Sequence, residues 1–298
     1  MDFWKKLKRF FRTTPARKQV EQRRELLRSS YLGRTVEVEL FLPSNLSAAT
    51  QLPLLVFNDG QDSTALRIEP TLQDLFDAGA IPDCMVVGVH AADRLQEYGT
   101  HLQLDYQQRG QRANAYVQFV LRELLPWLEY EFPITTNPAQ RFFFGFSLGG
   151  LSAFDIVWNY PNAFGAVGVF SGALWWRHQP FRAEDPDADR IVHDMVNADA
   201  FRPGLRFWLQ TGTRDETDDR NQNGIIDSID DTNDLILLLE QKGYRNDGYE
   251  IRYVEVLDGE HNQQTWAQVL PQFLLWCFQA PDITGLENQE DHMAATKM

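Results

Sequence analysis

The chain has 298 residues, of which 43% are hydrophobic and 23% charged, values typical of a soluble globular protein with a sizeable core. Its formal net charge of −14 is unevenly distributed, because residues 1–34 hold 11 Lys and Arg against 3 Asp and Glu. The acidic remainder would repel phosphates, which excludes nucleic acid as a partner. No apolar stretch is long enough to span a bilayer.

The first 28 residues form a basic segment in which aromatic side chains alternate with Lys and Arg. It has no continuous apolar stretch and no small-residue cleavage site, so it is not a secretory signal and we expect a cytoplasmic protein. We interpret it as an amphipathic helix that either packs on the domain or lies on an anionic membrane surface. We expect the main domain to span residues 29–281, followed by a polar, disordered tail at 282–298.

Seven predicted strands follow in chain order, at residues 35–43, 52–58, 84–90, 142–147, 166–172, 205–212 and 249–257. The first and last alternate apolar and polar residues, as half-exposed strands do, whereas the five between them are continuous apolar runs typical of buried strands. Helical patterns separate them at residues 113–132, 148–161, 231–244 and 261–279, and Pro126 is expected to kink or break the first. This alternation predicts an α/β fold with a mostly parallel central sheet and helices on both faces.

The strongest motif is the G-x-S-x-G sequence at residues 145–149, which lies between a predicted buried strand and a predicted helix. This context is that of the nucleophile elbow of the α/β-hydrolase fold, in which a tight turn projects the serine hydroxyl from the sheet edge. Ser147 is therefore the predicted nucleophile. The backbone N–H of Leu148, at the start of the helix, is predicted to donate to an oxyanion.

A serine nucleophile needs a general base, and α/β hydrolases carry serine, acid and histidine in that chain order. His261 follows the last predicted strand and is the expected base. Asp215 follows the preceding strand and is the expected acid, with the adjacent Glu216 as an alternative and Asp218 further from the strand end. The second oxyanion donor should come from the loop after an early strand, and the N–H of Gln61 is assigned there.

Residues 219–230, with the sequence DRNQNGIIDSID, match a twelve-residue calcium loop. Gly224 occupies the turn position and Ile226 the apolar anchor. The predicted ligands are the side chains of five residues and one backbone carbonyl: Asp219, Asn221, Asn223, Asp227 and Asp230, with the carbonyl of Ile225. We expect a structural Ca²⁺ that fixes the acid loop, and no organic cofactor; the alternative is an ordinary polar turn.

Five stretches occur in an order that resembles the esterase family of α/β hydrolases with enterochelin-esterase-like and feruloyl-esterase-like members: FNDGQD, DRLQEYG, GFSLGGLSAFD, FSGALWWR and DGEHNQQTW. The resemblance covers residues 30–280. It implies hydrolysis of small-molecule esters by Ser147, Asp215 and His261. Four further residues are expected to line the substrate site: Trp175, Trp176, Arg94 and Glu97.

Simpler roles for these four residues are core packing for the tryptophans and a rim salt bridge for the other two. The calcium-like loop and the missing export signal depart from many members of the family. Acyl transfer to an alcohol, or a binding protein on the same fold, are the alternative functions. The sequence leaves the acyl and alcohol groups of the substrate open.

Overall fold

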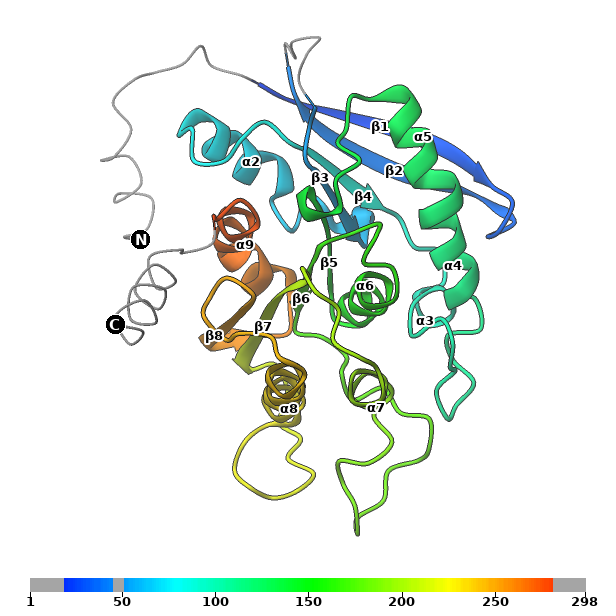
Figure 1. The fold of residues 1–298 in the computed structure, drawn as a ribbon, viewed down its shortest axis with the longest axis vertical. Coiled ribbons are helices and arrows are strands. Elements are labelled where there is room, and N and C mark those ends of the chain that lie inside the picture. The colour runs from blue at the N-terminus through cyan, green and yellow to red at the C-terminus, as the bar shows by residue number, and fades with distance from the viewer. Residues whose placement is uncertain (1–18, 45–50, 281–298) are drawn as a thin grey trace, which may run out of the picture.

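The computed structural model describes residues 19–44 and 51–280, in which the strands form one eight-stranded sheet. The strand order is β1-β2-β4-β3-β5-β6-β7-β8 (Figure 1). The bounds are β1 (Val20–Ser29), β2 (Arg34–Pro43), β3 (Leu54–Asn58), β4 (Met85–Val89), β5 (Arg141–Phe146), β6 (Ala166–Phe170), β7 (Arg206–Arg214) and β8 (Ile251–Glu260). Strands β3 to β8 are parallel, while β2 pairs antiparallel with both β1 and β4. The predicted α/β-hydrolase architecture with a mostly parallel sheet is confirmed.

The edge strand β1 corrects the predicted start of the domain at residue 29. Residues 20–29 pair along their whole length with β2, from Val20 opposite Pro43 to Ser29 opposite Arg34. Most of the β1 side chains are exposed, so the strand lacks the apolar pattern by which the others are recognised. The aromatic residues of the predicted amphipathic helix lie in residues 1–18, and the predicted tail at 282–298 lies beyond residue 280; both are outside the described residues.

Helices cover both faces of the sheet (Figure 1). Their bounds are α2 (Ile68–Asp77), α3 (Arg94–Glu97), α4 (Ala113–Phe119), α5 (Leu125–Glu131), α6 (Leu148–Asn159), α7 (Ile191–Ala198), α8 (Asp227–Lys242) and α9 (Gln263–Cys277). The predicted break at Pro126 is instead a π-helical turn, Val120–Leu124, which joins α4 to α5. A π turn accommodates a residue that has no N–H to donate, so the helix continues through the proline.

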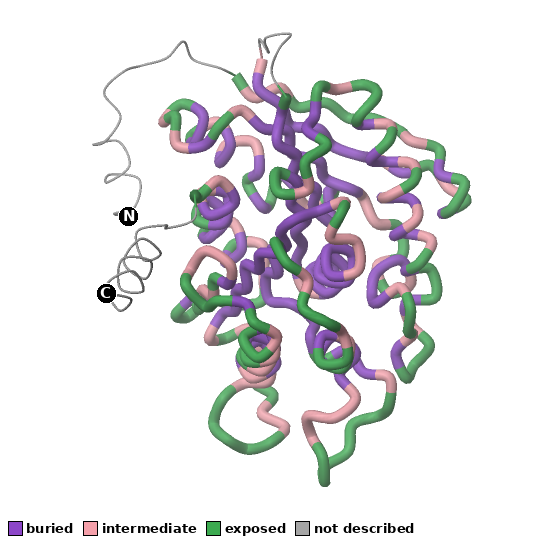
Figure 2. Tube along the Cα trace, in the orientation of Figure 1, coloured by how far each residue is buried: buried purple, intermediate pink, exposed green. Residues whose placement is uncertain are grey.

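Two apolar cores lie on opposite faces of the sheet, and the buried strands and α6 form the centre of the molecule in Figure 2. One core is rich in phenylalanine and includes residues of α2 and α9. The other includes residues of α4 to α8. Cys84 and Cys277 are buried free thiols, as expected. None of the helices in residues 19–44 and 51–280 is long and apolar enough to cross a membrane.

Candidate active site

Ser147 lies on the turn between β5 and α6, where the motif predicts it. Its backbone has φ 54° and ψ −123°, a conformation that residues other than glycine rarely adopt. A Cβ atom on Gly145 would lie 2.3 Å from the carbonyl oxygen of Gly149, and one on Gly149 would lie 2.8 Å from Oδ2 of Asp59. Position 145 therefore requires glycine, a Cβ at position 149 would displace the Asp59 carboxylate, and the strained turn holds the half-buried serine at the end of the strand.

Asp215 directly follows β7, and two polar neighbours favour its ionised form. Its Oδ2 accepts the backbone N–H of Gly212 at 2.9 Å, and the hydroxyl of Ser171 lies close enough to the carboxyl group to lower its pKa. Its Oδ1 is buried without a hydrogen-bond partner. Burial raises the pKa of Asp215, while the Gly212 N–H, the Ser171 hydroxyl and the nearby His261 lower it; the net shift is upward. The carboxylate thus has one oxygen fixed and one available to a donor.

His261 lies between the end of β8 and the start of α9. Its ring packs edge-on against Trp266, with ring centroids 5.3 Å apart and planes at 78°. Desolvation lowers the pKa of His261, the Asp215 carboxylate raises it and the Arg94 guanidinium lowers it; the net shift is downward. A lowered pKa keeps the imidazole neutral near pH 7, the state that a general base requires.

The three predicted triad residues lie in one neighbourhood at the carboxyl edge of the sheet. Asp215 and His261 shift each other's pKa, and the ring of Trp266 contacts both His261 and Phe146, the residue before the nucleophile. No hydrogen bond joins Ser147 to His261, or His261 to Asp215, in the described part of the chain. Hydrogen bonds of this kind often tighten only when substrate binds.

Glu216, the alternative acid, contacts α8. Its Oε1 accepts the backbone N–H of Ser228 at 2.5 Å, in the first turn of α8. Burial is the main cause that raises its pKa to about 6, with smaller contributions from the carboxylates of Asp227, Asp231 and Asp218. These contacts bind Glu216 to α8, whereas Asp215 interacts with His261, and this difference favours Asp215 as the acid.

The loop that carries Gln61 packs against the elbow. The side-chain amide of Asn58 donates to the carbonyl of Gly149 at 2.7 Å, which ties the loop to the first turn of α6. Gln61 lies in the short 3₁₀ turn Gly60–Asp62, and Leu148 is the first residue of α6. Amides in the first turn of a helix have no partner within the helix. The N–H groups of both predicted oxyanion donors therefore belong to first turns that meet at the elbow.

Arg94 and Glu97, both predicted to contact substrate, have different surroundings. The guanidinium of Arg94 binds both carboxylate oxygens of the buried Asp59, at 2.7 and 2.9 Å, and lies close enough to His261 to lower its pKa. Glu97 is 1% exposed and forms two hydrogen bonds with Arg34, at 2.8 and 2.7 Å. Glu97 therefore anchors α3 and is a correction to the predicted site, while Arg94 lies at its rim.

The two tryptophans also divide between core and rim. Trp176 is 1% exposed and packs against the backbone near Gly99, so it is a core residue and not the predicted substrate contact. Trp175 is 40% exposed. The guanidinium of Arg109 lies over both rings, 4.6 Å from the centroid of Trp176 and 5.3 Å from that of Trp175. Only Trp175 is available to a ligand.

The predicted cation loop is folded around its own polar groups. The carboxylate of Asp219 accepts the backbone N–H groups of Asn223 and Gly224, at 3.1 and 2.9 Å. The side-chain amides of Asn221 and Asn223 donate to Oδ2 of Asp230, at 3.0 and 2.7 Å. These contacts bring together four of the predicted side-chain ligands, and oxygen donors of this kind suit a hard cation such as Ca²⁺.

Asp227 fits the predicted cation site less well than the other four side-chain ligands. Its Oδ1 accepts the backbone N–H of Arg220 at 2.8 Å, at the start of α8. The carboxylates of Asp219, Asp227 and Asp230 do not converge within 4.8 Å of one another. Ile225, the predicted carbonyl ligand, lies in the exposed part of the loop. The cation would therefore need a rearrangement of Asp227 or a water in its place.

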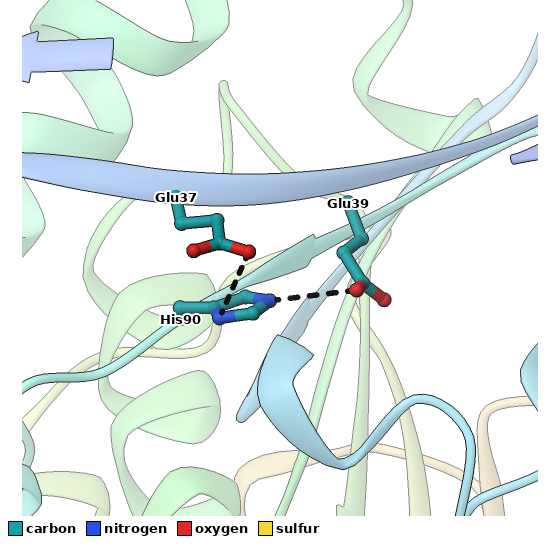
Figure 3. Close-up of side chains that lie close together, drawn as sticks. All are labelled: Glu37, Glu39 and His90. Atoms are coloured by element: carbon teal, nitrogen blue, oxygen red, sulfur yellow. Dashed lines mark ion pairs between the residues drawn. The ribbon is translucent and has the colours of Figure 1, made fainter. Parts of the chain in front are cut away.

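A second ionisable cluster, which the sequence did not reveal, joins β2 to the residue that follows β4 (Figure 3). The ring of His90 lies between two carboxylates, with Nδ1 3.9 Å from Glu37 and Nε2 3.8 Å from Glu39. Arg24 of β1 contacts the same two carboxylates at 2.7 and 2.9 Å, and the hydroxyl of Ser63 donates to Glu39. One guanidinium thus offsets part of the charge of the two carboxylates, and the cluster connects β1 to the segment after Gln61.

This fold and the strand–Ser–helix turn at the carboxyl edge define the chain as an α/β hydrolase. A family model described as "Putative esterase" matches residues 29–277. The chain belongs to this esterase family, a family of carboxylic ester hydrolases. The match begins at the last residue of β1, so this edge strand lies almost entirely outside the part matched by the model.

The relatives share the fold at low sequence identity. The uncharacterised protein YjcH of Bacillus subtilis is 26% identical over 244 residues, 81% of this chain and 91% of the relative. The iron(III) enterobactin esterase of Escherichia coli K12 is 26% identical over 205 residues, 67% of this chain and 47% of that enzyme. The solved enterobactin esterase of Shigella flexneri superposes with a TM-score of 0.69 at 23% identity, over 88% of this chain and 60% of that one. This chain therefore spans about half to three fifths of the length of those two enterobactin esterases.

Proposed function

We propose that the protein is a serine carboxylic-ester hydrolase that acts through an acyl-enzyme on Ser147. The single observation that carries the proposal is the strained strand–Ser–helix turn with His261 and Asp215 beside it. Ser147 has a φ of 54°, and backbone strain of this kind is concentrated at functional sites.

The chemistry follows from the position of each group. His261 accepts the proton of the Ser147 hydroxyl as the Oγ attacks the ester carbonyl, and Asp215 stabilises the imidazolium. The N–H groups of Leu148 and Gln61 stabilise the oxyanion. When the tetrahedral intermediate collapses, the C–O bond to the alcohol breaks and His261 returns the proton to the alcohol. Water then attacks the acyl-enzyme with the same base and releases the acid.

The substrate is proposed to be a small-molecule ester that contacts Arg94 and Trp175. The test is turnover of aryl and alkyl esters with varied acyl chains, with Ser147→Ala as the matched control. Hydrolysis that depends on Ser147 supports the proposal. Wild-type protein that turns over no ester in the panel contradicts it. If added alcohols divert the acyl group into new esters faster than water releases the acid, the protein is an acyltransferase on the same site.

We also propose that residues 219–230 bind a structural Ca²⁺, because oxygen donors from Asp219, Asn221, Asn223 and Asp230 meet in one loop. A cation would offset their negative charge and rigidify the segment between Asp215 and α8. Binding to the folded state alone stabilises it by about 2.7 kcal/mol when free Ca²⁺ is ~100 times the dissociation constant. Mg²⁺ should substitute poorly, because it demands tight octahedral geometry.

Calorimetry and thermal unfolding of metal-stripped protein test the cation proposal. We expect binding heat with Ca²⁺, a higher Tm, and loss of both in Asp230→Asn. Asp218→Asn is the matched control, because it removes an exposed carboxylate that the loop pattern does not use. An unchanged Tm and no binding heat at millimolar Ca²⁺ would show that the loop is an ordinary polar turn.

A further inference from the structure

Two glutamates and a histidine, none of them part of the proposed triad, meet where β2 pairs with β4 (Figure 3). Glu37 and Glu39 are two positions apart on β2, so their side chains share one face of the sheet. The backbone N–H of His90, the residue after β4, donates to the carbonyl of Glu37 at 3.0 Å. Backbone pairing thus places the imidazole beside the two carboxylates, and all three groups are potential metal ligands.

The three side chains supply ligand atoms at nearly the spacing that one metal ion requires. One His90 nitrogen and one oxygen from each glutamate all lie within 4.8 Å of one another. Zn²⁺ binds histidine nitrogen and carboxylate oxygen at about 2.0–2.2 Å, which places two tetrahedral ligands about 3.4 Å apart. The atoms therefore need to approach one another by up to about 1.4 Å. The Glu37 side chain is 31% exposed, so it has room for this movement.

The imidazole of His90 lacks the hydrogen bond that a buried nitrogen normally forms. Its Nε2 is buried and has no hydrogen-bond partner. The carboxylate that this nitrogen faces, on Glu39, is 3.8 Å away, which is too long for a hydrogen bond. The side chain of Glu39 is only 4% exposed. A buried nitrogen that faces a buried carboxylate at this distance leaves a gap that a metal ion would bridge.

Arg24 contacts the carboxylates that a cation would bind. Its guanidinium is 2.7 Å from Glu37 and 2.9 Å from Glu39, and its side chain is 63% exposed on the edge strand β1. Because exposed ion pairs contribute little stability, this guanidinium can be displaced at low cost. It offsets one of the two carboxylate charges, whereas a divalent cation offsets both. The other nearby guanidinium, on Arg34, is paired with Glu97.

The cluster contacts the loop that carries Gln61, the proposed oxyanion donor. The hydroxyl of Ser63 donates to the carboxylate of Glu39. A Cβ atom on Gly60 would lie 2.8 Å from Cδ2 of His90, so the loop and the ring are closely packed. A cation held by His90 and Glu39 would therefore restrain this loop from the side of β2.

We propose that Glu37, Glu39 and His90 form a binding site for one Zn²⁺ or a similar transition-metal ion, which displaces the guanidinium of Arg24. The imidazole ligand favours this class of ion over Ca²⁺ and Mg²⁺, which prefer oxygen ligands alone. Three protein ligands leave the fourth tetrahedral position to water. The inference does not depend on the proposed esterase function or on the proposed Ca²⁺ loop.

Calorimetric titration of Zn²⁺ into the metal-stripped full chain tests the site without any ester turnover. We expect binding that Mg²⁺ does not reproduce, because Mg²⁺ binds oxygen ligands and releases its waters reluctantly. His90→Gln should abolish this binding. Glu37→Gln should weaken it at least tenfold, since even the loss of a group that only orients a ligand costs 10- to 100-fold in affinity. Arg24→Gln should tighten it severalfold, because the competing guanidinium is gone.

His178→Gln is the matched control. Its ring also lies near two carboxylates, Asp189 at 3.2 Å and Asp194 at 3.7 Å, but these three residues do not form a converging set in the described part of the chain. This variant should bind Zn²⁺ as the wild type does.

The variants of Glu37 and Arg24 keep the test decisive if His90→Gln does not fold, because both change side chains that reach solvent. Wild-type affinity in Glu37→Gln together with wild-type affinity in Arg24→Gln would overturn the inference. Binding that is lost in His261→Gln and retained in His90→Gln would also overturn it, since the ion would then lie at the triad. So would the absence of binding heat in the wild type at submillimolar Zn²⁺.

Discussion

Replacing Ser171 with alanine tests how the predicted acid is held. Ser171 follows β6, is 1% exposed and accepts the indole N–H of Trp266 at 2.9 Å, and its hydroxyl lies close enough to Asp215 to lower the pKa of that carboxyl group. The change removes a hydroxyl that favours the ionised carboxylate, an interaction that contributes up to about 1.5–3 kcal/mol if it forms a hydrogen bond to the charged group, and leaves a buried indole N–H without a partner, which costs about 1–3 kcal/mol.

The effect on rate follows from the first of these losses. If the whole 1.5–3 kcal/mol is expressed in the transition state, kcat/KM for a small aryl ester falls about 10- to 150-fold. The loss should be smaller than that of Ser147→Ala, because the base and nucleophile remain. Trp266→Phe is the matched control: it keeps an aromatic ring against His261 but lacks the indole N–H, so it should reduce the rate less than Ser171→Ala.

The pH dependence of stability gives a second readout. Burial already raises the pKa of Asp215, so its ionised form lowers the stability of the folded state at neutral pH. Removing the Ser171 hydroxyl raises this pKa further. The protonated acid needs no such donor, so the difference in free energy of unfolding between variant and wild type should narrow as the pH falls through the folded-state pKa. Wild-type kcat/KM in Ser171→Ala, with a stability difference that is independent of pH, would refute this role.

Three other outcomes are expected. Asp215→Asn should lower kcat by orders of magnitude while Glu216→Gln stays within severalfold of wild type, and the reverse result in the same kinetic assay would move the acid to Glu216. Deletion of residues 1–18 should leave hydrolysis intact, whereas deletion of residues 1–28 should lower the Tm because it removes most of β1. Liposome flotation of the full and the truncated chains tests whether the basic segment binds anionic lipid. The rate constant kcat/KM should fall on the acid side with a midpoint below pH 6.5, because the pKa of His261 is lowered by burial. Activity is retained above that pKa and lost as the pH falls through it. A midpoint above pH 6.5 would contradict a lowered pKa of His261.

The sequence was sufficient for the buried part of the sheet and for the elbow. Strands β3 to β7 are continuous apolar runs, and the motif around Ser147 lies at the junction of one such strand with a helix, so both patterns are local. The edge strand β1 was missed because its side chains are mostly exposed and its pairing with β2 is set by backbone hydrogen bonds. An exposed, charged edge strand has no periodic apolar signal to recognise.

The site residues that were missed or misassigned depend on contacts between distant segments. Ser171 and Trp266 are 95 positions apart and meet only in the folded sheet. Glu97 was placed at the substrate because its motif resembles the family, but its partner Arg34 lies 63 positions earlier. Trp175 and Trp176 are adjacent and chemically identical, so only the backbone direction decides which is buried.

The most direct test of the central claim is to locate the covalent adduct formed with a fluorophosphonate, because only an activated serine reacts with such a reagent. Intact-mass measurement should show one adduct per chain, and fragmentation of the peptide that contains residues 142–177 should place it on Ser147 rather than on Ser152 or Ser171. Ser147→Ala should remain unlabelled and retain less than about a tenth of wild-type ester turnover. Labelling of another serine, or full turnover in Ser147→Ala, would contradict the account.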